Sequence, residues 1–121
     1  MLDFIILQTA SIKEALIKIN DNNKGFLIVL DDNKKVIGVI TDGDIRRLFI
    51  QGLTASDSII FKKPLKLLKN TDSFHKICEL FKDEKTNFLP ICNDEMRFVN
   101  LITKKQFHSL LLQDKDWDLN D

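Results

Sequence analysis

The sequence repeats itself, and this repeat constrains the fold more than any other feature. When the chain is shifted by 62 positions, residues 9–49 align with residues 71–111 without a gap. The identical pairs fall at helix starts, strand starts and core positions: Thr9/Thr71, Ser11/Ser73, Asp21/Asp83, Phe26/Phe88, Leu27/Leu89, Asp32/Asp94, Ile40/Ile102, Thr41/Thr103 and Leu48/Leu110. One copy of about 45 residues is too small to bury a stable core alone. We therefore expect two copies of one structural unit that pack as a single domain.

Each copy begins with a helix signal. In the first copy Ser11 and Glu14 form a capping-box pattern, and apolar residues follow at helical spacing, which predicts a helix ending near residues 21–23. In the second copy Ser73 stands at the corresponding place. The apolar positions are Ile12, Ala15, Leu16 and Ile19 in the first copy and Phe74, Ile77, Cys78 and Phe81 in the second.

Two strands and a closing helix are expected next in each copy. Continuous apolar runs are typical of strands buried on both faces, and the polar residues at 31–34 and 93–96 predict hairpin turns. The predicted strands are 26–30 and 35–40 in the first copy and 88–92 and 97–102 in the second. The closing helices have apolar faces formed by Ile45, Leu48 and Phe49 and by Phe107, Leu110 and Leu111.

Short apolar segments at 4–7 and 65–68 predict a third strand for each sheet. Residues 52–63, which end at Pro64, form a short link between the two copies that we call the connector. The predicted fold class is α/β (α+β), with two tandem β-α-β-β-α repeats packed as one pseudo-twofold domain. The boundaries we expect are a single module at 1–121, repeats at 4–52 and 64–113, and an acidic tail or linker at 114–121.

Charge and hydrophobicity argue against nucleic acid and membranes as partners and against a signal peptide. The chain has 18 basic and 18 acidic residues, so it lacks the basic excess that neutralises the phosphates of nucleic acid. Its apolar runs are far shorter than the roughly 20 residues that span a bilayer. Asp3 stands where a signal peptide needs positive charge. We expect a cytoplasmic protein with no nucleic-acid or membrane partner.

The cysteines and histidines form no recognisable site. Cys78 and Cys92 lie in apolar periodic segments, so we interpret them as small buried side chains. His75 and His108 are widely separated and lack the spacing of metal ligands. Since no nucleophile, base or carboxylate pair has a catalytic sequence context, we expect no metal, no cofactor and no catalytic residue.

Residues 36–47, VIGVITDGDIRR, carry the strongest chemical signal, because a strand runs directly into a helix there. The N–H groups of a helix start favour phosphate, and Asp44 can accept both hydroxyls of a ribose. Thr41 offers a hydroxyl, and Arg46 or Arg47 can donate to phosphate. The same residues also have a purely structural interpretation, because Thr41-x-x-Asp44 resembles a capping box. For Arg47 we favour an exposed position on the helix surface.

The repeat and this segment resemble a known family, the tandem CBS domains that form a Bateman module. Residues 38–44, GVITDGD, are similar to the family's Gly-x-x-Thr/Ser-x-x-Asp ligand signature, and the repeat covers nearly the whole chain. Residues 41–47, TDGDIRR, look like CBS pairs attached to sugar-phosphate nucleotidyltransferases or arabinose 5-phosphate isomerases. Because the pair begins within the first residues of the chain, we favour the N-terminal arrangement of the nucleotidyltransferases.

The resemblance implies a nucleotide site in the first repeat. It implies that Asp44 binds the ribose of an adenosyl or similar nucleotide, that Thr41 binds phosphate or ribose, and that Arg46 approaches phosphate. It further implies that the base lies between two apolar backbone segments, Thr9-Ala10 before the first helix and Gly25-Phe26-Leu27-Ile28 at the first strand. For Phe26 and Leu27 core packing is an equal alternative, and Thr9 is also a candidate helix cap.

The second copy departs from the signature. Asn100 replaces the glycine and Gln106 replaces the ribose-binding aspartate, although Gln106 can still complete a capping box with Thr103. This change argues against a second nucleotide site. Residues 87–91, NFLPI, resemble the base-binding strand of the family and leave an altered site open.

We interpret the chain as a non-catalytic regulatory module that binds AMP, ADP, ATP or another nucleotide and controls an attached sugar-phosphate enzyme, favouring a nucleotidyltransferase. The alternative is a ligand-free dimerisation or docking module. CBS pairs often dimerise through their helices, so we expect a homodimer with apolar residues 48–49 and 110–112 at the contact. Nucleotide binding separates the two interpretations.

Overall fold

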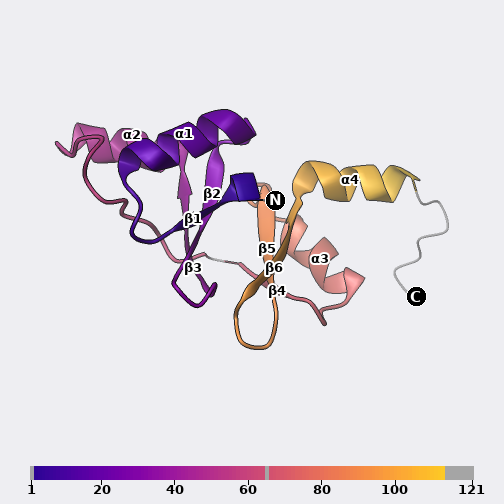
Figure 1. The fold of residues 1–121 in the computed structure, drawn as a ribbon. Coiled ribbons are helices and arrows are strands. Elements are labelled where there is room, and N and C mark those ends of the chain that lie inside the picture. Colours follow the sequence, from indigo (N-terminus) through magenta and orange to yellow (C-terminus); the bar gives the residue numbers. More distant parts are fainter. Residues whose placement is uncertain (1, 65, 114–121) are drawn as a thin grey trace. The chain divides into compact units, whose positions relative to one another are not determined.

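The computed structural model describes residues 2–64 and 66–113, which belong to two compact units, Met1–Leu65 and Lys66–Asp121. The first unit contains a short 3-10 helix (Leu2–Phe4), β1 (Ile5–Leu7), α1 (Ile12–Asn22), β2 (Phe26–Leu30), β3 (Val36–Thr41) and α2 (Asp42–Ile50) (Figure 1). The second unit contains β4 (Leu68–Lys69), α3 (Phe74–Phe81), β5 (Phe88–Cys92), β6 (Phe98–Thr103) and α4 (Lys104–Gln113). The predicted α+β class and the repeated β-α-β-β-α order are confirmed. The predicted tail at 114–121 lies outside the described residues.

Each unit is built on a three-stranded sheet with the same topology. In the first unit the order is β1-β2-β3, with β1 parallel to β2 and β2 antiparallel to β3; β4-β5-β6 repeats this arrangement in the second unit. Phe26 pairs with Thr41 in the first sheet, and Phe88 pairs with Thr103 in the second. The 62-residue shift therefore relates the hydrogen-bond registers as well as the sequences.

Several predicted strand ends differ from the structure. β1 begins one residue late because the 3-10 helix takes the chain up to Phe4. β4 spans Leu68–Lys69, whereas we predicted 65–68; residue 65 lies outside the described residues, and residues 66 and 67 form no strand. The return strands β3 and β6 each lie one residue later than predicted.

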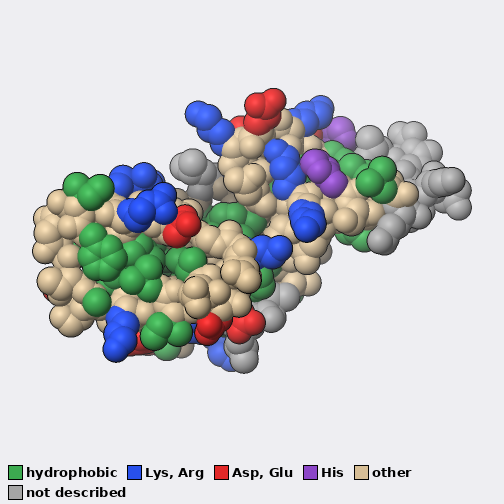
Figure 2. Space-filling model, turned by 90° about the horizontal axis from the view of Figure 1, so that it is seen from above, with side chains coloured by type: hydrophobic (Ala, Val, Ile, Leu, Met, Phe, Trp, Pro, Cys, Tyr) green, Lys and Arg blue, Asp and Glu red, His purple; other side chains and the backbone are tan. Residues whose placement is uncertain are grey.

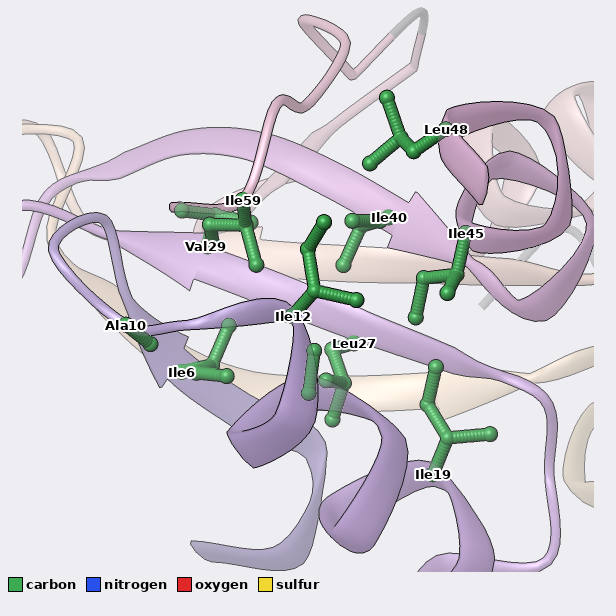
Figure 3. Packing of buried hydrophobic residues seen from close by; sticks show 11 residues of the cluster. Ile6, Ala10, Ile12, Ile19, Leu27, Val29, Ile40, Ile45, Leu48 and Ile59 are labelled. Carbon is green, nitrogen blue, oxygen red and sulfur yellow. The ribbon is translucent and has the colours of Figure 1, made fainter. Parts of the chain in front are cut away.

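The core of the first unit lies between its sheet and the helices α1 and α2 (Figure 3). Leu27 and Ile40 from the sheet and Ile12 from α1 are fully buried there. In the second unit Leu68, Phe81, Leu89 and Phe107 form the corresponding cluster. The members of the first cluster are Ile6, Ala10, Ile12, Ala15, Ile19, Leu27, Val29, Ile40, Ile45, Leu48 and Ile59.

Not every residue of the predicted apolar helix faces is buried. In α2, Ile45 and Leu48 are buried, but 40% of Phe49 is exposed. In α4, Phe107 is buried, whereas Leu110 and Leu111 are each 41% exposed. Hydrophobic side chains also reach the surface in the first unit on the face seen from above (Figure 2). Helical spacing identifies the side of a helix that can be buried, but the neighbouring elements decide how much of it is covered.

The connector belongs structurally to the first unit. The N–H of Ile12 donates to the carbonyl of Asp57 (2.9 Å), so connector carbonyls satisfy part of the first turn of α1. Ile59 donates its N–H to the carbonyl of Ala10 (3.0 Å) and buries its side chain in the core. Lys62 forms an isolated antiparallel bridge with Val39 of β3. The segment that we predicted to be a short link is therefore packed along the first unit.

The two cysteines differ in their surroundings. Cys92 is buried, and Cys78 is half-buried. Burial raises the pKa of both thiols.

Within residues 2–64 and 66–113, there is no cluster of three side chains suited to a metal ion. In that same part of the chain, no helix is both long and apolar enough to cross a membrane.

Candidate functional site

The candidate site begins where β3 passes directly into α2. Thr41 has an extended conformation, and its hydroxyl accepts the N–H of Asp44 (3.1 Å). In return, Oδ2 of Asp44 accepts the N–H of Thr41 (3.0 Å). The structural interpretation of Thr41-x-x-Asp44 is therefore right about the geometry, because a complete capping box is present.

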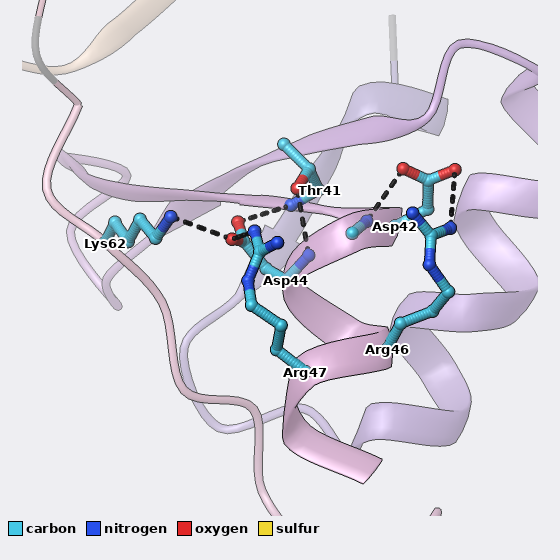
Figure 4. A network of polar contacts seen from close by, with 7 residues as sticks. Thr41, Asp42, Asp44, Arg46, Arg47 and Lys62 are labelled. Atoms are coloured by element: carbon cyan, nitrogen blue, oxygen red, sulfur yellow. Dashed lines mark hydrogen bonds and ion pairs between the residues drawn. The ribbon is translucent and has the colours of Figure 1, made fainter. Parts of the chain in front are cut away.

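Asp44 also contacts two cationic side chains (Figure 4). Its Oδ1 lies 2.8 Å from the guanidinium of Arg47 and 3.0 Å from the ammonium of Lys62. The Asp44 residue is only 8% exposed, whereas the side chains of Arg47 and Lys62 are 61% and 67% exposed. The carboxylate is thus buried, while the two cationic side chains that it binds are exposed to solvent.

These contacts keep Asp44 ionised. Burial by itself raises the pKa of this carboxyl group, but hydrogen bonds from Arg47 and Lys62, and then from the capping threonine, outweigh it. The pKa of Asp44 is lowered from 3.8 to about 2. At neutral pH the group is an acceptor for hydroxyls and a partner for cations.

The two arginines of the segment have different positions. Arg46, the residue predicted to approach phosphate, lies 3.7 Å from Asp42, and its side chain is 72% exposed. Arg47, predicted to be only a surface residue, is the arginine that contacts Asp44. Its i,i+3 spacing from Asp44 is the sequence signal that points to this pair. No such signal exists for Lys62, which approaches from the connector.

The first backbone N–H groups of α2 already have partners within the chain. Asp42 donates its N–H to the carbonyl of Gly25 (3.0 Å), and Gly43 donates to Oδ1 of Asp42 (2.8 Å). The next N–H, that of Asp44, donates to the Thr41 hydroxyl. A phosphate at this end of the helix would therefore meet exposed cationic side chains before it met vacant N–H groups.

The residues implied for base binding divide between the two ends of β2. Gly25 and Phe26 lie at its start beside Thr41, whereas Thr9 and Ala10 follow β1, whose Leu7 pairs with Leu30 at the other end. Figure 3 shows this separation, with Ala10 and Ile45 at opposite ends of the packed core. Five residues of strand span roughly 13 Å between the first and last Cα. Seven of the nine predicted residues thus form two groups at opposite ends of β2, and the other two, Leu27 and Ile28, lie between them.

The second group borders a pocket. A cavity of about 320 Å³ is lined by Thr9 and Ala10, by the three residues of β1, by Leu30 at the end of β2, and by Glu14 and Lys18 of α1. Between the two groups, Leu27 and Ile28 are fully buried in β2, and Phe26 is 6% exposed with its ring against Phe4 (5.4 Å between centroids). These three side chains serve the packing, which leaves their backbone for any contact with a ligand.

The second repeat keeps the cap but not the charge. Gln106 accepts the N–H of Thr103 (2.9 Å), and the Thr103 hydroxyl accepts the N–H of Gln106 (3.1 Å), which confirms the predicted capping box. Asn100, at the position of Gly38, is exposed and accepts the N–H of Leu101 through its own side chain. A neutral amide therefore occupies the position of the Asp44 carboxylate.

Comparisons with known proteins agree with this architecture. Residues 3–51 match the family model described as CBS domain. A Methanocaldococcus jannaschii structure, described as a putative archaeal homolog of g-AMPK, superposes with a TM-score of 0.79 at 27% identity, over 90% of this chain and 46% of that one. A CBS domain protein from Pyrobaculum aerophilum, complexed with AMP, gives 0.73 at 20% identity, over 90% and 88%. The chain thus has the fold of a CBS-domain pair, and its first repeat matches the CBS-domain family.

Other proteins that the chain resembles are longer. CbpB, in complex with c-di-AMP, has the same fold with a TM-score of 0.77 at 22% identity, over 90% of this chain and 76% of that one. Arabinose 5-phosphate isomerase KdsD of Escherichia coli is 40% identical over 48 residues, or 40% of this chain and 15% of the isomerase. Homoserine O-acetyltransferase of Methanosphaera stadtmanae is 28% identical over 102 residues, or 84% of this chain and 21% of that enzyme. The chain spans about a fifth or less of the length of these two curated relatives.

Proposed function

We propose that this CBS-domain pair is a non-catalytic regulatory module of the cytoplasm that binds an adenine nucleotide through its first repeat. The observation that carries the proposal is the Asp44 carboxylate, which is buried, ionised and held by exposed cations at the end of β3. An ionised carboxylate can accept both hydroxyls of a ribose, and nearby cations attract a phosphate. The ribose and the phosphate of a nucleotide thus both have suitable partners at one end of the sheet.

Within this proposal the site residues have separate tasks. Thr41 and Asp44 bind the ribose, and Arg46 is free to reach a phosphate because its pairing with Asp42 is long and exposed. Gly25 and Phe26 offer backbone beside them. The pocket at Thr9 and Ala10 has largely apolar walls, but it lies at the opposite end of β2 from Asp44. It is therefore a candidate for a separate purine ligand and not for the base of the nucleotide whose ribose binds Asp44.

The relatives support our choice of ligand class and of regulated enzyme. The Pyrobaculum protein is complexed with AMP and CbpB with c-di-AMP, so AMP is our first candidate, ahead of ADP, ATP and c-di-AMP. KdsD supports a sugar-phosphate isomerase as the attached or associated enzyme rather than the nucleotidyltransferase that we favoured from the sequence. The similarity to homoserine O-acetyltransferase makes an acyltransferase the competing candidate for the regulated enzyme. A ligand regulates such a host only by binding one conformation more tightly than another.

The test is a thermal-shift measurement with AMP, ADP, ATP and c-di-AMP on the wild type and on Asp44→Ala. A nucleotide at 100 times its Kd adds about 2.7 kcal/mol to the free energy of unfolding, which raises the melting temperature measurably. We expect this rise in the wild type and its loss in Asp44→Ala, with each protein compared with its own ligand-free melting temperature.

Gln106→Ala is the matched control for this experiment. It removes the equivalent capping side chain from the second repeat, so it loses a similar cap without touching the carboxylate. We expect Gln106→Ala to retain the full nucleotide-induced shift. A folded wild type that responds to none of these nucleotides, or a shift that survives in Asp44→Ala, would contradict the proposed site.

A second candidate function is a dimerisation or docking module. The exposed apolar side chains on α2 and α4 favour it, since Ile50 is 84% exposed and Leu112 is 81% exposed. We propose that these helices also join two copies of the chain in a homodimer. Dimer formation is compatible with nucleotide binding, so the absence of a nucleotide response in a dimeric protein would leave docking as the sole function.

A further inference from the structure

Lys62 reaches the candidate site from outside the elements that form it. It belongs to the connector, and its backbone is fixed to β3: the N–H of Val39 donates to the carbonyl of Lys62 (2.8 Å), and the N–H of Lys62 donates to the carbonyl of Val39 (3.1 Å). Phe61, the preceding residue, lies directly over Gly38. These contacts hold the base of the Lys62 side chain close to Asp44 whatever the ammonium group itself contacts.

The charges around Asp44 do not balance. Arg47 and Lys62 share its Oδ1, while its Oδ2 accepts the N–H of Thr41 (3.0 Å). One carboxylate therefore faces two cations and leaves one positive charge in excess. The neighbouring pair of Asp42 and Arg46 is neutral by itself and does not remove this excess.

A ribose that binds Asp44 must compete with these cations for the same oxygen atoms. The diol of a ribose is neutral, so it cannot compensate an ammonium group that it displaces, whereas a phosphate on the same ligand can. The Lys62 side chain is 67% exposed and long enough to turn from Asp44 to such a phosphate. Arg47 is less suited to this exchange because it projects from the same helix as Asp44, three residues further on.

We propose that Lys62 determines the specificity of the nucleotide site by selecting phosphorylated nucleosides over free nucleosides. The inference rests on the proposed function, because it requires ribose binding at Asp44. In the free protein Lys62 occupies Oδ1 of Asp44 and disfavours a neutral nucleoside. In the bound protein its ammonium pairs with the ligand's phosphate, so the competing group becomes a binding group.

The experiment compares the Kd of AMP with that of adenosine, measured by calorimetry, in the wild type, Lys62→Met and Lys63→Met. We expect the wild type to prefer AMP and Lys62→Met to lose about tenfold in AMP affinity, as for one partly exposed charged hydrogen bond. Adenosine should bind Lys62→Met as well as the wild type or better, because the competing cation is gone. The ratio of the two affinities reports on phosphate recognition, which a general loss of structure would not change selectively.

Lys63→Met is the matched control, since it removes the same charge from the neighbouring exposed residue. It should leave the AMP-to-adenosine preference unchanged. If AMP and adenosine both bind and Lys62→Met keeps the wild-type preference, the assignment of Lys62 is wrong and the proposed function stands. If neither ligand binds the folded wild type, both the proposed nucleotide site and the assignment of Lys62 are overturned.

Discussion

At the scale of single residues, Asp44 combines a structural and a chemical role. Its carboxylate completes the cap of α2 through Thr41, and the same group is the acceptor at the centre of the candidate site. Gln106 in the second repeat performs the first role alone, because an amide can cap a helix but carries no charge. The pair shows that the capping geometry and the negative charge are separable properties of this position.

The lowered pKa of Asp44 predicts a pH-dependent contribution to stability. Because the folded-state pKa is about 2 and the ordinary value is 3.8, the folded state binds a proton less readily than the unfolded state. The stabilisation is present above about pH 4 and is lost as the pH falls towards 2. It amounts to about 1–2 kcal/mol, since solvent screens the exposed ends of Arg47 and Lys62.

Urea unfolding of the wild type and Asp44→Asn between pH 6 and pH 2.5 measures this contribution. We expect the wild type to be the more stable protein at pH 6 and the difference to shrink steadily below pH 4. A difference that stays constant over this range would mean that the charge of Asp44 does not contribute to folding.

At the scale of elements, the connector explains the glycine of the signature segment. Gly38 lies in β3 directly beneath Phe61, and a Cβ atom there would overlap the Phe61 ring and lie 2.9 Å from the carbonyl oxygen of Lys62. The glycine therefore makes room for the connector, and the connector carries Lys62 to Asp44. Asn100 stands at the equivalent position of β6, where it is exposed.

Alanine substitutions at two glycines of this segment should have opposite effects. We expect Gly38→Ala to lower the free energy of unfolding by about 1–3 kcal/mol, because the connector must shift to accommodate the methyl group. In Gly43→Ala the atoms nearest to the added Cβ would be the ends of the Arg46 and Arg47 side chains, at 3.5 Å or more. This change should stabilise α2 by about 0.5–1 kcal/mol.

Denaturant unfolding of both alanine variants beside the wild type measures the two effects. Gly43→Ala serves as the control for Gly38→Ala, because the same methyl group is added only five residues away in the sequence. An unaltered stability in Gly38→Ala would show that the connector does not press on β3.

At the scale of the whole molecule, the chain repeats its architecture but not its chemistry. Both units share sheet order, strand register and capped closing helices. Only the first has the glycine at 38 and the carboxylate at 44; the second has Asn100 and Gln106 instead. Duplication therefore preserved what the fold needs, while the charge expected to bind a nucleotide is confined to one repeat.

The proposed homodimer gives a prediction at the same scale. Leu112→Glu places a charge at a residue that is 81% exposed, so the fold should tolerate it while a helix-mediated dimer should not. We expect the dimer dissociation constant from sedimentation equilibrium to rise roughly tenfold or more. Gln106→Glu is the control, because it adds the same charge to α4 and keeps an acceptor for the Thr103 N–H. A wild type that is monomeric at high micromolar concentration would contradict the dimer.

The sequence alone was sufficient for the features that depend on neighbouring residues. Capping patterns, apolar helix faces and strands are encoded by spacings of two to four residues. The structure reproduces the strand ranges within about one residue except at β4, and it forms the capping boxes of Thr41 and Thr103. At Ser11 the hydroxyl accepts the N–H of Glu14 as predicted, but the Glu14 carboxylate accepts from that hydroxyl (3.4 Å) instead of from the Ser11 N–H. The end of α1 is an example: Asn23 adopts the left-handed conformation with φ +58° and donates its N–H to Ile19. Such contacts join residues that are close in the sequence, so they can be predicted without knowing how the chain folds over longer distances.

Only the tertiary structure decided which residues meet at the site. The pairing of Lys62 with Asp44 depends on how the connector returns along β3, and no local spacing encodes that path. The separation of Thr9 and Ala10 from Thr41 likewise follows from the strand directions, because the parallel β1 and the antiparallel β3 bring these residues to opposite ends of β2. A sequence pattern identifies residues with suitable chemistry, whereas long-range chain direction determines their partners.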